Sequence, residues 1–137
     1  MTLRRACSVV FAVLLGGCAS APERIVSLSD ARTYCDAGAS HVQVQYTGRV
    51  ATVLGVMRGP SGNHEGFEVY YTSKGRKRFA RVEDNIDITG PIPMSPGDRV
   101  SFQGQYECDD YVVHWTHHDP AGRHAGGYVE VNGRTYR

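Results

Sequence analysis

Apolar and polar residues alternate along most of the chain from residue 42 onward. In the first such segment Val42, Val44 and Tyr46 stand between polar neighbours, and Gly48 and Gly55 interrupt the pattern. A period of two is typical of a strand that buries one face, and interior glycines favour a bend. We therefore expect a long first strand that bends at its glycines and serves two halves of one barrel.

The same alternation predicts four further strands and a hairpin at the end of the chain. The strands cover residues 67–72, 77–82, 99–106 and 111–115, and the hairpin joins 128–131 to 135–136. In the last of these strands we expect Tyr111, Val113 and Trp115 to face the core. The hairpin turn is Asn132-Gly133, a dipeptide that favours two-residue β-turns.

Helix and loop signals complete the predicted fold. Ser29-Asp30 and Gly38 mark the start and end of a short helix over 30–37. Residues 84–98 contain three prolines and predict a long crossover loop. Together with five principal strands, this loop predicts an all-β fold, a small OB-fold-like Greek-key barrel with a short N-terminal helix. An open β-sandwich is the alternative.

The start of the chain resembles a bacterial lipoprotein signal. Arg4 and Arg5 precede an apolar run over 6–15 that is too short to span a bilayer, and Leu15-Gly16-Gly17-Cys18 resembles the site cut by lipoprotein signal peptidase. An ordinary secretory signal with a chance cysteine is the alternative. The resemblance implies a signal peptide over 1–17, a lipid-anchored tether over 18–28 that begins at a lipidated (palmitate-bearing) Cys18, and a single β-barrel domain over 29–137.

The cysteines follow from that signal. Cys7 leaves with the signal peptide and Cys18 carries the lipid, so Cys35 and Cys108 stay in the domain. Two thiols in an oxidising compartment usually pair. Their bridge would close a loop of about 70 residues and contribute roughly 4 kcal/mol to stability. Two separate buried thiols are the alternative.

Location and charge limit the possible partners. Ala19 rather than Asp follows the lipidated cysteine, which favours the inner leaflet of the outer membrane over the inner membrane as the final address. The chain has 15 Lys and Arg and 14 Asp and Glu, so removing Arg4 and Arg5 leaves 13 against 14, a net charge of −1. A near-neutral balance argues against general nucleic-acid binding. We expect the membrane, and an envelope protein or glycan, as partners.

A basic cluster falls at the expected turn between the second and third strands. It consists of Lys74, Arg76, Lys77 and Arg78. With Tyr70, Tyr71 and Phe79 nearby, this cluster predicts a patch for an anionic ligand, such as a phosphate backbone, an anionic glycan or lipid A phosphates. A solvated turn that protects an edge strand is the alternative.

Four of the six histidines fall between residues 114 and 124. If the last strand continues past Val113, then His114, Thr116 and His118 project from the face opposite Trp115. Imidazole and carboxylate ligands suit zinc, copper or manganese. The predicted metal ligands are His64, His114, His117, His118, Asp119 and His124. A structural turn, in which Asp119 binds backbone amides, and a catalytic site are the alternatives.

Several strings resemble a family of small bacterial domains of unknown function. They include His114-Trp115-Thr116-His117-His118-Asp119-Pro120, Gly62-Asn63-His64-Glu65-Gly66-Phe67, Asn85-Ile86-Asp87-Ile88 and Asn132-Gly133-Arg134-Thr135-Tyr136. The resemblance covers about residues 45–137. It departs from the family pattern around Cys108, which fits a disulfide specific to this lineage. The resemblance implies one compact domain and brings no established activity.

The sequence leaves three functions open. The leading hypothesis is a non-enzymatic, membrane-anchored periplasmic binding module that holds a transition metal at its histidines. The second is a metal-dependent hydrolase of the phosphodiesterase or nuclease type, although the sequence has no nucleophile motif or phosphate-binding glycine loop. The third is a structural envelope protein whose histidines only hold a turn.

Overall fold

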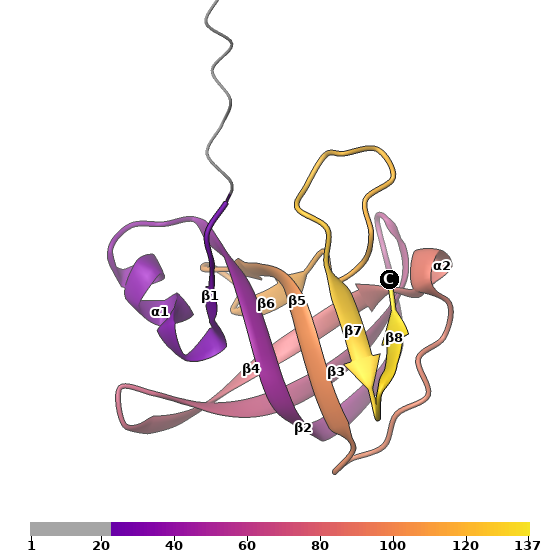
Figure 1. Cartoon of the computed structure of the whole chain (residues 1–137), viewed down its shortest axis with the longest axis horizontal. Helices are drawn as coiled ribbons and strands as arrows, with labels where there is room; N and C mark the ends of the chain where they lie inside the picture. Colours follow the sequence, from indigo (N-terminus) through magenta and orange to yellow (C-terminus); the bar gives the residue numbers. More distant parts are fainter. Residues whose placement is uncertain (1–22) are drawn as a thin grey trace, which may run out of the picture.

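The strands expected from the alternating pattern form one sheet that closes on itself. Figure 1 shows the computed structural model, which describes residues 23–137. Its helices are α1 (Leu28–Asp36) and α2 (Ile86–Thr89). Its strands are β1 (Ile25–Ser27), β2 (His41–Gly59), β3 (Gly62–Ser73), β4 (Arg76–Asn85), β5 (Arg99–Glu107), β6 (Val112–His114), β7 (Tyr128–Val131) and β8 (Arg134–Tyr136). The predicted all-β barrel is confirmed.

Five strands make the barrel wall, in the order β2-β3-β4-β6-β5 and back to β2. β4 and β6 run parallel, whereas the other four neighbouring pairs run antiparallel. β1 adds to the first half of β2, and the β7–β8 hairpin lies beside β5. This is a five-stranded Greek-key barrel of the OB-fold type.

β2 belongs to both halves of the barrel, as predicted. Residues 41–49 pair with β5, and residues 50–59 pair with β3. The register with β3 shifts between Val53 and Gly55, where Gly55 has a φ of 80° that residues with a side chain rarely adopt. A bulge of this kind bends a strand, which lets β2 continue around the barrel.

Alternate residues of the wall strands point inward and form one core. Phe67, Val82 and Phe102 are fully buried, and α1 adds Leu28 and Ala31 to the same cluster. Each large apolar side chain buried in this way contributes roughly 1.5–3 kcal/mol. The outward-facing residues of the same strands are therefore free to carry other chemistry.

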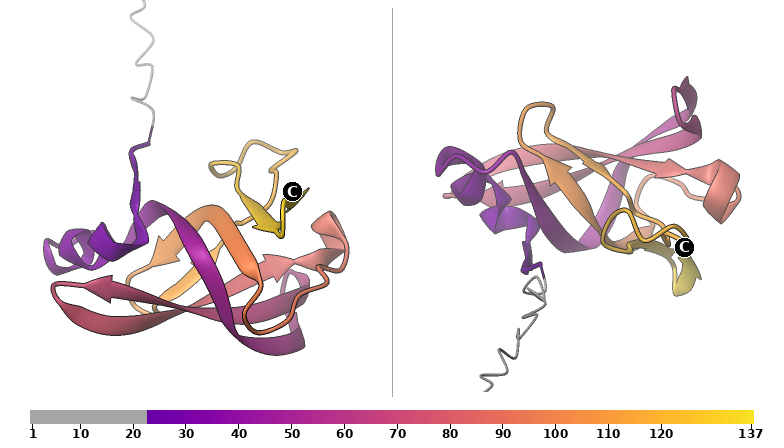
Figure 2. Two further views of the ribbon diagram at one scale, coloured as in Figure 1. Left: turned by 60° about the horizontal axis from the view of Figure 1, so that its bottom comes forward. Right: turned by 90° about the horizontal axis from the view of Figure 1, so that it is seen from above.

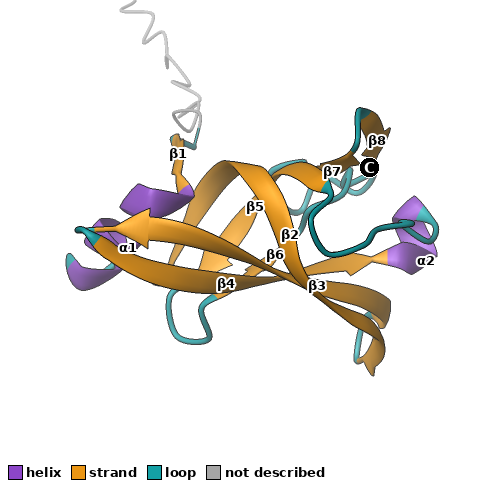
Figure 3. Cartoon of the chain, turned by 90° about the horizontal axis from the view of Figure 1, so that it is seen from below, coloured by secondary structure: helices purple, strands orange, loops and turns teal. Residues whose placement is uncertain are grey.

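The barrel has two differently built ends. α1 and the β3–β4 turn lie at one end, and α2 and the β2–β3 turn lie at the other (Figure 3). Lys74 contacts Asp36 at 2.9 Å at the first end, and Asp87 accepts a hydrogen bond from the amide of Asn63 at the second. The segment between β6 and β7 forms a loop that projects from the wall (Figure 2).

The N-terminal elements begin earlier than the sequence pattern predicts. Residues 25–27, expected in the tether, form β1 and pair with β2, and α1 begins at Leu28 rather than at residue 30. Val26 and Leu28 are buried, and their burial explains why the segment joins the barrel. α2 is a further addition, inside the predicted crossover loop, and the Asn85 side chain caps its start.

The predicted signal peptide and Cys18 lie outside the described residues. Within residues 23–137, no helix is both long and apolar enough to cross a membrane.

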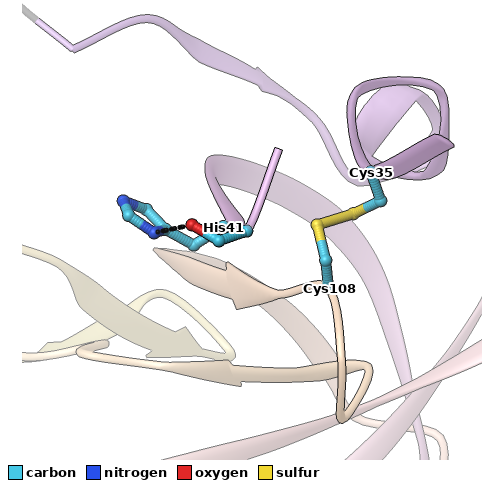
Figure 4. Close-up of a disulfide and its surroundings, with 4 residues drawn as sticks. Cys35, His41 and Cys108 are labelled. Carbon is cyan, nitrogen blue, oxygen red and sulfur yellow. Dashed lines mark hydrogen bonds between the residues drawn. A yellow bond between two sulfur atoms is a disulfide. The ribbon is translucent and has the colours of Figure 1, made fainter. Parts of the chain in front are cut away.

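Cys35 and Cys108 form a disulfide, as predicted (Figure 4). The bond joins α1 to the segment that follows β5, and the two Cα atoms are 5.5 Å apart. Beside it, the Ser40 hydroxyl forms a hydrogen bond with Nδ1 of His41 at 3.0 Å. The bridge therefore fixes α1 against the barrel wall.

Candidate functional site

Outward-facing residues of three strands line a small cavity at the α2 end of the barrel. His64 on β3 lies opposite Asn85 on β4, and His114 ends β6 beside Glu83. The cavity has a volume of about 40 Å³, enough for about one water molecule or ion. Its lining consists of Ser61, His64, Glu83, Asn85, His114, Trp115 and His117. We call it the histidine cavity.

Backbone carbonyls orient two of the imidazole rings in the histidine cavity. Nδ1 of His117 lies 2.8 Å from the carbonyl oxygen of His118, and Nδ1 of His64 lies 3.2 Å from that of Gly62. A ring nitrogen that faces a carbonyl oxygen carries the proton, so in the neutral rings Nε2 holds the lone pair. Nδ1 of His114 lies 3.6 Å from a carboxylate oxygen of Glu83.

A buried carboxylate, Asp84, supports this end of the barrel from inside. It is fully buried, accepts a hydrogen bond from the Thr116 hydroxyl at 2.7 Å, and accepts another from Thr89. Burial raises the pKa of Asp84, although the two hydroxyl donors oppose that shift. The sequence analysis did not predict a role for Asp84. The pattern that could have indicated one is an acidic residue at the inward position that follows Ala80 and Val82 on the same strand.

The predicted orientation of the last wall strand is right at Val113 and wrong at Tyr111 and Trp115. Trp115 and Tyr111 have φ values of 57° and 58°, in the left-handed region, and both are exposed rather than inward-facing. The turn at Trp115 breaks the alternation, so Thr116 points inward instead of outward. A left-handed backbone at a large aromatic residue is uncommon and is often found at binding sites.

Asp119 organises the loop that follows the strand. Its carboxylate accepts hydrogen bonds from the amides of Ala121, Arg123 and His124. Burial alone would raise the pKa of Asp119, but the three amide donors together hold it below its ordinary value. The His124 ring packs against Trp115, with 4.3 Å between ring centroids. These contacts match the structural-turn alternative for Asp119 and His124.

The six predicted metal ligands come from the cavity and the loop beside it, and the rings of His117 and His124 contact each other, with 5.1 Å between their centroids. His64, His114 and His117 line the histidine cavity, Asp119 and His124 belong to the loop, and His118 is exposed. Among residues 23–137, no three His, Cys, Asp or Glu side chains are arranged to hold a metal ion. Metal binding stays a prediction.

A second candidate surface lies on the outer face of β3 and β4. Tyr70 and Phe79 are directly opposite each other on the two strands, and their exposed fractions are 50% and 59%. Nζ of Lys77 lies 4.0 Å from the centre of the Tyr70 ring. Beyond β4 the face continues to Arg32 and Tyr111, which form a second pair of a cation and an aromatic ring. We call this surface the aromatic–basic face; it consists of Tyr70, Lys77, Phe79, Arg81, Tyr111 and Arg32.

The four residues of the predicted basic cluster differ in whether they lie on the aromatic–basic face. Lys77 stands on it, whereas Lys74 pairs with Asp36 of α1 at the end of the hairpin. Arg76 is exposed beside the turn, and the Nε atom of Arg78 is buried. Arg81 lies opposite Glu68 and forms an ion pair with Glu83 at 2.8 Å, so its charge is balanced within the protein. The basic residues of the β3–β4 turn therefore do not by themselves form the predicted patch for an anionic ligand.

The closed ring of strands and its polar outer surfaces define a small OB-fold-like barrel with sites suited to binding. The chain belongs to the family described as "Protein of unknown function (DUF3465)", whose family model covers residues 17–137. Comparisons with curated proteins and with solved structures give no significant match. The family brings no activity to this chain.

Proposed function

We propose that this protein is a lipid-anchored envelope protein that binds anionic glycans through its aromatic–basic face. The observation that carries the proposal is the exposed pair of Tyr70 and Phe79, which stands beside Lys77. In OB-fold proteins, the outer face of the second and third barrel strands is a common ligand surface. Those strands correspond to β3 and β4 here, so this support is an analogy of fold only.

The aromatic pair suits a ligand with flat apolar faces. Two large rings that lie side by side on a sheet, both at least half exposed, are unusual on a protein surface without a partner. Sugar rings present such faces on one side and hydroxyl groups at their edges. Glu68, opposite Arg81 on the neighbouring strand, adds an acceptor for those hydroxyl groups.

The charge on this face favours an anionic ligand. Lys77 and Arg32 stand beside the rings, and the guanidinium of Arg32 lies 4.1 Å from the centre of the Tyr111 ring, whereas Arg81 is paired with Glu83. The processed chain as a whole carries a net charge of −1, so the attraction is local. A local patch suits a short anionic glycan better than a long nucleic acid.

Isothermal titration calorimetry of the purified full chain with a sulfated heparin hexasaccharide tests the proposal. We expect saturable binding that weakens as salt rises. Phe79→Ala removes a ring at the centre of the face and should weaken binding about thirtyfold. Tyr128→Ala, which removes a ring from β7, is the matched control and should leave the affinity unchanged. Equal affinities for the two variants would contradict the proposal.

Lipid anchoring is the second part of the proposal. Its support is the Leu15-Gly16-Gly17-Cys18 string and the Cys35–Cys108 disulfide, which suits an oxidising compartment. Labelling with palmitate in a Gram-negative host should mark the wild-type chain and not Cys18→Ser. Labelling that survives in Cys18→Ser would overturn the anchor.

A transition metal in the histidine cavity is a second candidate function. The observation that favours it is the contact of Nδ1 with a carbonyl in His64 and His117, an arrangement common in metal-binding histidines. The side chains would have to turn to converge on one ion. Metal analysis of untagged protein should find a bound ion that is lost in His117→Ala and kept in His118→Ala. Protein without metal would remove this candidate.

A further inference from the structure

The outer face of β2, β5 and β7 has a different chemistry from the aromatic–basic face. Near the middle of these strands, outward positions carry amides and hydroxyl groups in direct register: Gln45 opposite Gln103, and Gln103 opposite Tyr128. Charged residues, such as Arg49, Arg99 and Glu130, lie further along the same strands. We call this surface the glutamine face. It consists of Gln45, Thr47, Ser101, Gln103, Gln105 and Tyr128.

A groove of about 490 Å³ lies at the border between this face and the start of α1. A volume of this size is within the range of small-molecule sites. Among the described residues 23–137, no Asp, Glu, Lys, Arg or His lines the groove. Its lining consists of Ser27, Leu28, Ser29, Gln45, Tyr46, Thr47, Tyr71, Thr72 and Tyr128.

The polar groups around the groove divide into fixed and free ones. Gln43 donates to Gln105 at 3.2 Å, and Gln103 donates to the carbonyl of Gly126 at 3.0 Å, so these amides are oriented by the protein. Within residues 23–137, the side chains of Gln45 and Thr47 form no hydrogen bond. The free groups are thus available to a ligand at the centre of the groove.

We propose that this groove binds a neutral saccharide, of the N-acetylhexosamine class. Uncharged hydroxyl and amide groups match the hydroxyls and acetamide of such a sugar and offer no counter-charge to an ion. Tyr46 and Tyr128, which are partly exposed, supply ring surfaces for its apolar faces. The groove reaches β3 at Tyr71 and Thr72 but contains none of the residues of the aromatic–basic face, so this inference does not depend on anionic-glycan binding.

NMR titration of the ¹⁵N-labelled full chain with chitotetraose, a neutral N-acetylglucosamine oligomer, tests the inference. We expect saturable shifts of the amides at Gln45, Thr47 and Thr72. Gln45→Ala should weaken binding about fivefold to tenfold, because it removes a hydrogen-bonding amide from the centre of the groove. Phe79→Ala, which changes a residue outside the lining of the groove, is the control and should bind the oligomer as well as the wild type does.

Three results would overturn the inference. The first is an absence of saturable shifts at millimolar sugar, and the second is an affinity that Gln45→Ala leaves unchanged while its spectrum shows a folded chain. The third is a set of shifts around Phe79 instead of Gln45, which would place the sugar on the aromatic–basic face. Failure of heparin binding with chitotetraose binding intact would remove only the anionic-glycan proposal.

Discussion

The two outer faces of the barrel share one scaffold and differ in chemistry. On β3 and β4, outward positions carry exposed rings and cations, including Tyr70, Phe79 and Lys77. On β2, β5 and β7, the outward positions nearest the groove carry neutral amides and hydroxyls, such as Gln45 and Gln103. The inward residues of both sets build the same core. Outward residues therefore set binding chemistry with little effect on the fold.

α1 lies at the border of both faces. Its start contributes Leu28 and Ser29 to the groove, and Arg32, one turn further on, contacts the ring of Tyr111 on the aromatic–basic face. The disulfide from Cys35 fixes this helix. Changes to α1 should therefore affect both faces, whereas changes on one strand face should affect one.

Loss of the disulfide should have the largest effect. The bridge spans 73 residues, so replacing Cys35 and Cys108 together by Ser should lower the free energy of unfolding by about 4 kcal/mol. Urea denaturation followed by circular dichroism measures the change, with the reduced wild-type chain as the matched comparison. We also expect weaker binding at both faces. An unchanged midpoint would show that α1 is held by packing alone.

Removal of Asp84 should disturb one end of the barrel. Asp84→Ala leaves the hydroxyls of Thr89 and Thr116 without their buried acceptor and should cost about 2 kcal/mol. Hydrogen exchange should rise around the histidine cavity and stay unchanged at Gln45. Uniform exchange over the whole barrel would contradict a local role.

The raised pKa of Asp84 also predicts a direction of pH dependence. Its folded-state pKa lies above the ordinary value of 3.8, so between these two values the folded chain binds more protons than the unfolded chain. This group therefore adds stability as pH falls through that range. Asp84→Asn should remove this contribution, as measured by thermal unfolding at a series of pH values. An identical pH profile in Asp84→Asn would contradict the assignment.

The smallest expected effect separates two lysines of the same hairpin. Lys77→Ala should weaken binding of the heparin hexasaccharide about threefold to fivefold, because Lys77 stands on the aromatic–basic face. Lys74→Ala removes the same charge from the turn, where Lys74 pairs with Asp36, and should change affinity less. Calorimetry at low salt distinguishes them. Equal losses of heparin affinity in the two variants would indicate that binding depends on the overall charge of the chain and not on the position of Lys77.

The wall strands were predictable because side-chain alternation follows burial. Val44, Phe67 and Val100 occupy inward positions of a simple period of two, and all are buried. The pattern failed where the backbone leaves that period. Tyr111 and Trp115 take left-handed conformations, which hydrophobicity does not encode, and this change also turns Thr116 inward.

The candidate sites were less predictable than the fold because they depend on contacts between distant segments. The basic string around residue 77 was visible, but its use depends on Tyr70 and Asp36, which the fold places beside it. The histidines near residue 117 looked like one cluster. A backbone hydrogen bond to Asp119 holds His124 in the loop, where its ring contacts that of His117, whereas His118 is exposed.

A competition titration tests the central claim, that the two faces bind separate ligands, most directly. The full chain is first saturated with chitotetraose and then titrated calorimetrically with the heparin hexasaccharide. We expect the same heparin affinity as in chitotetraose-free protein, because the lining of the groove shares no residue with the aromatic–basic face. A heparin affinity that falls as chitotetraose rises, or no heparin binding at all, would contradict it.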